Sequence, residues 1–464
     1  MSTSGPTSAQ RRPQGGRRPP KESAVGRWLG VLAVIGLVAF FMIRAPTDPP
    51  PLGEGGAGGE APIGEPPPRP RCKAAEGTFR VGDGPDASEG AGDAGGAEPE
   101  RFAPFSVEIG RGARTASGWV VGIKRDVKTD DGVGTFAEVV VLDDGASKGR
   151  VVRLGRTRGD LDAPLVVAAR GGWVAAMLEP NASGLSTRLV RTDGEGLHWG
   201  AEIEQGRDES LAHDLAIGER VGVVTWDDVV GDGERAVVMV ATVATESLEG
   251  GERAVAVSGD DVDAELPRLV RRPGGFWLAY VARSRSDDGE PRDPRATEGR
   301  FAAERIVPSW IELLPLDEDG NAQGEPRPVT ARTGHVLAFD MGVGRDGGVV
   351  IALRDDDTPS GAQGGTVTAM FVGASGVGQE QPITSEEVGA GVPNLVGGFV
   401  TLPDGLGHVL AAPIAPDAEL GGELRREDAF GIGQVLAADG DRLLVARPSG
   451  KAADFAVVTC SREP

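Results

Sequence analysis

The segment PLVVAARGGWVAAMLEP, residues 164–180, sets the pattern of this 464-residue chain. Two short apolar runs, rich in Val and Ala, flank a turn that contains two glycines. Short apolar runs that end at glycine or acidic turns are typical of β-strands, and no sustained 3.6-residue period is seen here. We therefore interpret this segment as a β-hairpin.

The same pair of apolar runs occurs seven times between about residue 100 and residue 460. The first runs start at residues 106, 164, 214, 267, 340, 393 and 429, a mean spacing of about 54 residues. The second runs start at Gly118, Gly172, Val221, Gly275, Gly348, Gly407 and Arg442. Further apolar runs, such as 139–145 and 150–154, supply a third and a fourth strand. Four short strands per unit of about 50 residues are typical of a β-propeller blade.

The sequence thus predicts an all-β protein in which residues 72–464 form a β-propeller of seven blades, each with four antiparallel strands. The short sixth unit leaves six and eight blades as alternatives. Two tandem β-sandwiches would not explain the regular spacing. The charged stretch Arg283 to Arg305 lies in the longest unit and predicts an exposed loop. In this pattern, over about residues 75–460, the chain resembles bacterial exported β-propeller repeat proteins in general, a resemblance that implies no functional residues.

The N-terminal region predicts a membrane anchor. Residues 1–27 are polar and basic, and an apolar run from Trp28 to Ile43 follows, closed by Arg44. Sixteen residues span about 24 Å as a helix, and flanking arginines can reach the membrane surface. We predict a cytoplasmic tail over 1–27 and one transmembrane helix over 28–44, oriented by the positive-inside rule. A cleaved signal peptide is the alternative, although no small-residue cleavage pattern follows the run.

The region after this helix is predicted to be exported into the periplasm or the extracellular space. Residues 45–71 are rich in Pro and Gly and predict a disordered linker, and residues 82–100 predict a disordered acidic insert. Residues 1–44 are basic, so the rest of this chain of net charge −22 is strongly acidic. Such a body is unsuited to binding nucleic acid through a basic surface.

Two cysteines, Cys72 and Cys460, are the only ones in the chain. In an oxidising compartment they are expected to form one disulfide, because no CxxC motif and no nearby histidine favour a metal site. The bond would tie the start of the folded region to its last strand, 455–460, and residues 78–81 would lie beside that strand. A propeller closed in this way would complete one blade with strands from both ends of the chain.

The motifs that carry chemistry are missing from the sequence. The four histidines lie apart, and neither HExxH nor Gly-x-Ser-x-Gly occurs. Residues 192–199 approach the Asp-box pattern of sialidases, but the spacing between Asp193 and Trp199 is one residue off. The single tyrosine, Tyr280, lies in a strand that resembles core. The acidic turns do not match a calcium-binding loop and are interpreted as solvated turns. We therefore favour a binding role over an enzyme and expect no resident cofactor.

One set of polar residues is predicted to meet in space. If the first run of each unit is the innermost strand, the residues at which these runs begin surround one mouth of the central channel. They are Asp162, His213, Asp214, Glu265, Asp340 and Asp428. This acidic ring suggests a site for a cation such as Ca²⁺ or for a cationic ligand. The alternative is that Asp and Pro simply begin strands well.

The sequence therefore predicts a membrane-anchored, exported β-propeller that serves as a binding or scaffold module of the cell envelope. Its partner would be an envelope protein or a small ligand, with the membrane contacted through residues 28–44. A hydrolase that acts on glycans or peptides from the channel mouth is the alternative function. A purely structural domain, kept soluble by its acidic surface, is a third.

Overall fold

A computed structural model describes the chain between residues 72 and 460. The described ranges are 72–82, 107–129, 132–181, 184–192, 196–205, 212–230, 235–251, 253–285, 308–355, 365–373, 376–384, 391–404, 406–449 and 451–460. All of them belong to one compact unit, Pro67–Pro464. The predicted tail, membrane helix and linker, and nearly all of the acidic insert, lie outside these ranges. No helix within these ranges has the length and apolar character needed to cross a membrane.

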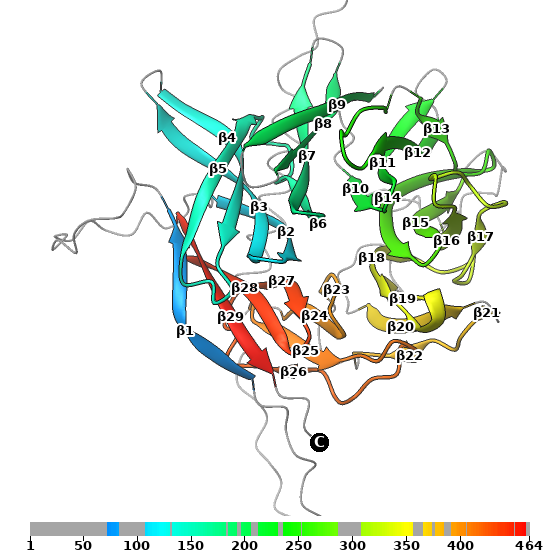
Figure 1. The fold of residues 1–464 in the computed structure, drawn as a ribbon. Helices are drawn as coiled ribbons and strands as arrows, with labels where there is room; N and C mark the ends of the chain where they lie inside the picture. Colours follow the sequence, from blue (N-terminus) through cyan, green and yellow to red (C-terminus); the bar gives the residue numbers. More distant parts are fainter. Residues whose placement is uncertain are drawn as a thin grey trace, which may run out of the picture. The chain divides into compact units, whose positions relative to one another are not determined.

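The described residues form seven antiparallel sheets arranged in a ring, as Figure 1 shows. In six sheets the four main strands follow sequence order from the centre outward, and one of these sheets carries a fifth short strand; in the seventh sheet the first strand of the chain, β1 (Cys72–Val81), lies outermost. Each innermost strand contacts the innermost strands of both neighbouring sheets, so the ring is closed. The predicted seven-bladed β-propeller is therefore confirmed.

The innermost and second strands correspond to the two runs of the repeat. The innermost strands are β2 (Val107–Thr115), β6 (Leu165–Ala169), β10 (His213–Ile217), β14 (Val262–Arg272), β18 (Val336–Val343), β23 (Asn394–Val396) and β27 (Gln434–Asp439). The second strands are β3 (Gly118–Thr129), β7 (Gly172–Pro180), β11 (Val221–Val230), β15 (Gly275–Ser284), β19 (Val349–Asp355), β24 (Phe399–Pro403) and β28 (Arg442–Ser449).

The outer half of each blade is made by the third and fourth strands. The third strands are β4 (Gly132–Leu142), β8 (Leu185–Thr192), β12 (Arg235–Ala244), β16 (Ser309–Leu316), β20 (Thr366–Gly373), β25 (Val409–Pro413) and β29 (Ala452–Cys460). The outermost strands are β5 (Gly149–Arg156), β9 (Leu197–Gln205), β13 (Val255–Ala256), β17 (Arg327–Pro328), β21 (Gly376–Val377), β26 (Arg425–Arg426) and β1 (Cys72–Val81). The short strand β22 (Gln381–Pro382) also pairs with β20, and a single 3-10 turn spans Arg345–Gly347.

Each second strand contains a buried apolar run, because both faces of that run are covered by neighbouring blades. In β7 every residue from Trp173 to Leu178 is buried. The core lies between adjacent sheets, where for example Trp119 of β3 and Phe455 of β29 belong to one cluster. The glycine that opens several second strands has a steric cause. A Cβ at Gly172 would lie 2.1 Å from the carbonyl oxygen of Thr192.

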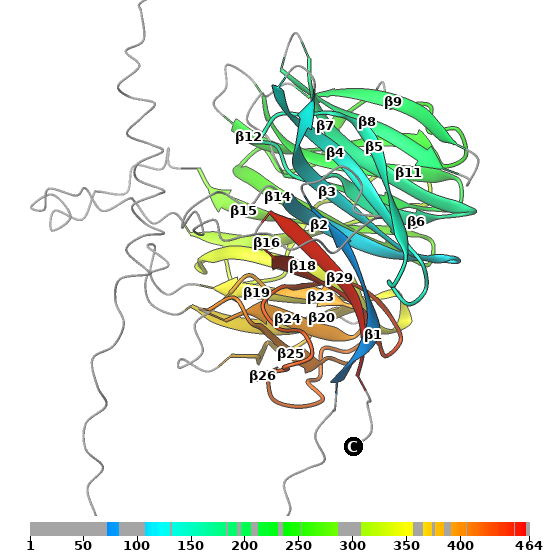
Figure 2. The ribbon, with the colours of Figure 1, turned by 90° about the vertical axis from the view of Figure 1, so that its left-hand side faces the viewer.

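The two ends of the folded unit complete one blade. Strand β1 lies beside β29 in Figures 1 and 2, and the strand order of this sheet is β1-β29-β28-β27. The register pairs Cys72 with Cys460, and these two cysteines form a disulfide bond. The predicted disulfide and the predicted closure are therefore confirmed.

Two units depart from the sequence pattern. In the sixth unit the second strand is β24, so the run that starts at Gly407 belongs to the third strand, β25. In the seventh unit residues 429–433 form no strand, because the backbone N–H of Phe430 donates to the carbonyl of Glu427 in a turn. The fully buried ring of Phe430 gives these residues their apolar pattern. Asp428 consequently lies in the turn before β27 and does not begin an inner strand.

Candidate functional site in the central channel

The innermost strands surround a cavity of about 710 Å³. Residues from all seven blades line it, and the charged ones are Glu108, Arg111, Asp162, His213 (when protonated), Arg268 and Asp340. A concave space of this size is in the range that small ligands occupy. The channel is therefore the first candidate for a functional site.

Arg111 of β2 reaches across the channel to carboxylates of two other blades. Its Nη2 lies 2.5 Å from Oδ1 of Asp340, and its Nη1 lies 3.8 Å from Oδ2 of Asp214. Both carboxylates are buried, whereas the Arg111 side chain is 39% exposed. Burial alone would lower the pKa of Arg111, but the two carboxylates outweigh it and raise that pKa. These charges therefore compensate one another across the ring.

Arg268 of β14 belongs to the same cluster, with its Nε 4.0 Å from Oδ1 of Asp340. Burial and the nearby Arg111 lower the pKa of Arg268, partly opposed by the attraction of Asp214 and Asp340. The cluster thus joins four blades, through residues of β2, β10, β14 and β18.

The acidic residues of the inner strands also connect neighbouring blades. In each case a carboxylate accepts a hydrogen bond from a backbone N–H of the next inner strand or the loop that leads to it, 55 residues further along the chain. The pairs are Glu108 with Ala163 at 2.9 Å, Asp214 with Leu269 at 2.9 Å, and Asp340 with Leu395 at 2.8 Å. The recurrence of one bond at one spacing indicates that these carboxylates set the angle between blades. Their presence at the inner strands therefore has a structural cause.

At the channel mouth, Asp162 precedes β6 and lies near a second carboxylate, that of Glu108. Desolvation by the channel walls, followed by the negative charge of Glu108, raises the pKa of Asp162, although more than a third of the side chain remains accessible. His213, Lys124 and Arg268 partly oppose this rise. Glu108 forms an ion pair with Lys124 at 2.6 Å. The mouth thus holds two carboxylates in different surroundings.

Lys124 is held in place by the chain that leads to β6. Its Nζ donates to the carbonyl oxygen of Gly159 at 2.8 Å and to that of Leu161. The side chain is almost buried, so its charge acts at short range on Glu108.

The predicted ring of six residues is only partly assembled. Asp162, His213 and Asp340 line the channel, and Asp214 lies next to it, against Arg111. Glu265 instead pairs with Arg283 of its own sheet at 3.3 Å, and Asp428 lies in the turn before β27. Within the described part of the chain, no group of three or more His, Cys, Asp or Glu side chains is placed to hold a metal ion.

The sequence analysis missed the cations of the channel: Arg111, Lys124 and Arg268. Arg111 lies in β2, three residues after Glu108, and Lys124 lies in the second strand β3, so neither residue stands at the start of an inner strand. Glu108 is not among the predicted site residues either, although it lies in the first apolar run of its unit, as Asp214 and Asp340 do.

Tyr280 lies in the core, as its strand suggested. The ring is fully buried and its hydroxyl donates to Oε2 of Glu312 at 2.9 Å, while Trp310 donates to Oε1 at 3.0 Å. Burial and the adjacent carboxylate raise the pKa of Tyr280 far above its ordinary value. This tyrosine does not line the channel cavity.

No protein-family model matches the sequence, and no curated protein is significantly similar to it. Solved structures of low identity share the propeller architecture. The β-propeller domain of the Trilobed protease from Pyrococcus furiosus is 10% identical and covers 78% of this chain and 95% of its own, with a TM-score of 0.46. Polysaccharide lyase Uly1 is 9% identical over 84% of this chain and 100% of its own, with a TM-score of 0.49.

The α-L-arabinofuranosidase Arb93A from Fusarium graminearum is 10% identical and covers 76% of this chain and 97% of its own, with a TM-score of 0.39. At these values the likeness carries no conclusion about activity or ligand.

Proposed function

We propose that the channel mouth binds a glycan and that the protein cleaves a glycosidic bond there, with Asp162 as the proton donor. The observation that carries this proposal is the pair Asp162 and Glu108, two carboxylates held in different electrostatic surroundings at one cavity. Glycosidases commonly use two such carboxyl groups, one protonated and one ionised.

The residues of the cavity favour a glycan over a peptide. Peptides are cleaved by an activated Ser, Cys or Thr, by a metal-bound water, or by two carboxylates that share one proton, as in aspartic proteases. Glu108 is instead engaged by Lys124, so it does not form such a proton-sharing pair with Asp162. Of the residues that line the cavity, only Thr401 carries a hydroxyl, and none is a cysteine. Cleavage of a glycosidic bond requires two carboxyl groups, and the channel mouth holds those of Asp162 and Glu108.

In this proposal each residue has one task. Protonated Asp162, favoured by its raised pKa, donates to the leaving glycosidic oxygen. Glu108, which pairs with Lys124, acts on the other side of the bond, either on the sugar carbon or through a water molecule. Arg111 and Arg268, at the base of the cavity, donate hydrogen bonds to sugar hydroxyls.

A second candidate is a binding module without catalysis, the role favoured by sequence. It is supported by the state of Asp214 and Asp340. Both carboxylates already accept backbone hydrogen bonds and lie against Arg111, so they hold this lining arginine in a fixed position at the cavity. A ligand-binding propeller needs no more than such a fixed side chain and a cavity.

The test compares Asp162→Asn with a matched control, Asp160→Asn. Asp160 lies two residues away, pairs with Arg158 at 3.1 Å and has a side chain that is 67% exposed. The release of reducing ends is measured with a panel of neutral and acidic polysaccharides, and glycan binding is measured by calorimetry. We expect Asp162→Asn to lower the rate by about 100-fold or more, with binding retained, because general acid catalysis contributes 10²–10⁴-fold.

The control variant should keep the wild-type rate. Binding by the wild-type protein without cleavage of any polysaccharide would favour the second candidate. Equal rates for the two variants would contradict the role of Asp162.

We also propose that the chain is exported and anchored in the cell membrane by residues 28–44, with the propeller in the periplasm or outside the cell. The disulfide between Cys72 and Cys460 supports export, because such bonds persist in oxidising compartments. An envelope protein remains a proposed partner in this setting. The proposal is tested by thiol alkylation of intact cells: both cysteines should resist alkylation until a reductant is added.

A further inference from the structure

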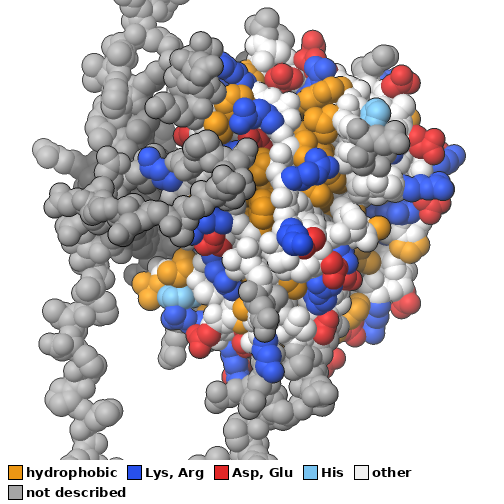
Figure 3. Space-filling view, turned by 60° about the vertical axis from the view of Figure 1, so that its left-hand side comes forward, with side chains coloured by type: hydrophobic (Ala, Val, Ile, Leu, Met, Phe, Trp, Pro, Cys, Tyr) orange, Lys and Arg blue, Asp and Glu red, His pale blue; other side chains and the backbone are white. Residues whose placement is uncertain are grey.

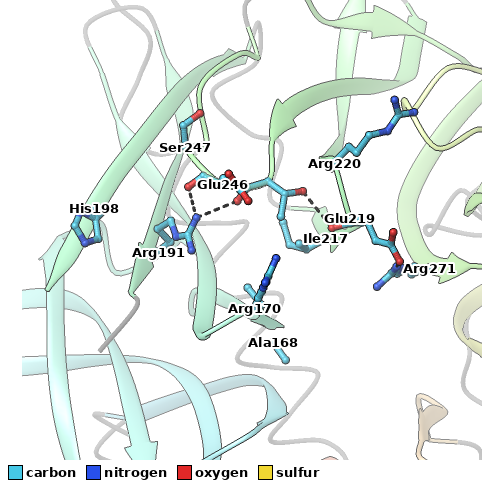
Figure 4. Close-up of a pocket in the computed structure, with 13 residues that line it drawn as sticks. Ala168, Arg170, Arg191, His198, Ile217, Glu219, Arg220, Glu246, Ser247 and Arg271 are labelled. Carbon is cyan, nitrogen blue, oxygen red and sulfur yellow. Dashed lines mark hydrogen bonds and ion pairs between the residues drawn. The ribbon is translucent and has the colours of Figure 1, made fainter. Parts of the chain in front are cut away.

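A second, larger pocket lies at the opposite ends of the inner strands from Asp162. It has a volume of about 1200 Å³ and is shown in Figure 4. Asp162 precedes β6, whereas Arg170 follows it, so the two sites lie at opposite ends of this strand. The end of β6 with the residue that follows it (168–170), the end of β10 with the turn that follows it (217–220) and the loop after β12 (245–247) form much of its wall.

Four arginines line this pocket: Arg170, Arg191, Arg220 and Arg271. Only two carboxylates, those of Glu219 and Glu246, accompany them, which leaves a local charge of +2 on a chain of net charge −22. On the face drawn in Figure 3, by contrast, acidic and basic side chains are interspersed. A concave concentration of guanidinium groups in an acidic protein indicates an anionic ligand.

Most of these guanidinium groups are available to a ligand. Arg170 is exposed and has no hydrogen-bond or ion-pair partner among the described residues. Arg271 pairs with Glu219 at 3.1 Å, with side chains that are 52% and 86% exposed. Arg220 pairs with Asp319 of a neighbouring loop at 2.8 Å, and both side chains are more than half exposed. Exposed pairs of this kind are weak, and an incoming anion can replace them.

Arg191 is more firmly fixed. Its Nη1 donates to the carbonyl oxygen of Thr245 at 3.3 Å and to that of Glu246. These bonds hold the guanidinium group at the wall of the pocket, where Figure 4 shows it beside the loop that follows β12. The pocket therefore combines one fixed cation with three that can adjust.

We propose that this pocket binds an acidic oligosaccharide, whose carboxylates pair with the arginines and whose hydroxyls donate to Glu219 and Glu246. The inference does not depend on cleavage at the channel mouth. Guanidinium groups bind carboxylates through two parallel hydrogen bonds. Of the lining residues only Ala168, Ala169 and Ile217 are aliphatic, so the pocket offers little to an apolar anchor of a peptide.

Two further observations favour an oligomeric and sparsely charged ligand. The volume exceeds that of a typical small-molecule site, and a second hollow of about 570 Å³ shares residues 218–220 and Arg271 with it. That hollow extends the groove to Arg272 and the turn after β14. A densely charged polyphosphate would be repelled by Glu219, Glu246 and the net charge of the protein.

The test is calorimetric titration of the full chain with a galacturonic acid trimer, a neutral galactose trimer and inorganic phosphate. The variants are Arg170→Gln and Arg271→Gln, with Arg150→Gln as the control, because Arg150 is an exposed arginine of β5, far outside the lining. We expect the acidic trimer to bind the wild-type protein and the control equally. Each pocket variant should weaken this binding about tenfold, the usual effect of losing one charge-assisted hydrogen bond.

The neutral trimer should bind at least tenfold more weakly than the acidic one. Equal binding of the two trimers, or equal affinities of Arg170→Gln and Arg150→Gln for the acidic trimer, would overturn the proposal. Binding of phosphate without binding of the acidic trimer would assign the pocket to a small anion and would overturn the saccharide. Retained glycan cleavage in both pocket variants leaves the channel site as a separate function.

Discussion

Arg111 pairs with two buried carboxylates, those of Asp214 and Asp340, at the centre of the ring. Asp340 is 3% exposed and Asp214 is 5% exposed, and Arg111 is the cation nearest to Asp340. Removing one partner of a buried ion pair leaves an uncompensated charge and commonly costs about 3–5 kcal/mol. The Arg111 side chain is partly accessible, so solvent screens part of this cost.

We therefore expect Arg111→Gln to lower the free energy of unfolding by about 2 kcal/mol, measured by urea denaturation. The double variant Arg111→Gln/Asp340→Asn should lose less than the sum of the two single variants, because it removes both charges and keeps an acceptor for the N–H of Leu395. Arg150→Gln serves as the control for charge. Additive losses would show that the two side chains do not interact.

At the scale of the structural element, three turns between strands share the same hydrogen-bond arrangement around an aspartate. The carboxylates of Asp143, Asp317 and Asp404 each accept two backbone N–H bonds from the residues that follow. For Asp317 the donors are Asp319 at 2.9 Å and Asn321 at 2.8 Å. Desolvation is the largest single contribution and raises the pKa of each aspartate, but the hydrogen bonds and a nearby cation together outweigh it and lower the pKa of all three below the ordinary value of 3.8.

These turns should make stability depend on acidity in a defined direction. A carboxylate with a lowered pKa contributes stability above its unfolded pKa, and this contribution is lost as the pH falls through the folded value. The free energy of unfolding should therefore fall as the pH drops below 3.8 and through the lowered pKa values of these three aspartates. In Asp143→Asn/Asp317→Asn/Asp404→Asn this fall should be smaller, with Glu325→Gln, at an exposed position, as the control. An unchanged pH dependence in the triple variant would contradict the assignment.

The elements of the propeller were largely predictable because each blade repeats the same local requirements on its sequence. A second strand covered on both faces must be apolar, and a tight hairpin needs glycine where Gly172 meets Thr192. The apolar pattern wrongly predicted a strand at Phe430, because this side chain is buried although its backbone lies in a turn and pairs with no strand. It failed again at β24, a five-residue strand that lies close to the longer apolar run of β25.

The sites were less predictable because they depend on register between blades. The hydrogen bond from Arg111 to Asp340 joins residues that are 229 positions apart in the sequence, and no local sequence pattern predicts this contact. The arginines of the second pocket come from β6, β8, β10 and β14 or the turns that follow them, each with an ordinary local sequence. Only closure of the ring brings these side chains together.

At the scale of the whole molecule, closure depends on one blade made from both ends of the chain. The disulfide joins residues 388 positions apart, and β1 pairs with β29 over most of its length. In the chain-entropy model, cross-linking a loop of this size contributes roughly 6 kcal/mol by restricting the unfolded chain. The pairing of β1 with β29 belongs to the folded state and does not restrict the unfolded chain in this way.

We therefore expect Cys460→Ser to lower the melting temperature by several degrees under oxidising conditions. The wild-type protein with a reductant should melt at the same temperature as the variant, and Cys72→Ser/Cys460→Ser should not differ from the single change. The comparison is made by calorimetry with and without the reductant. Equal melting of the wild-type protein in both conditions would contradict a stabilising role for the bond and would leave β1–β29 pairing as the closure of the ring.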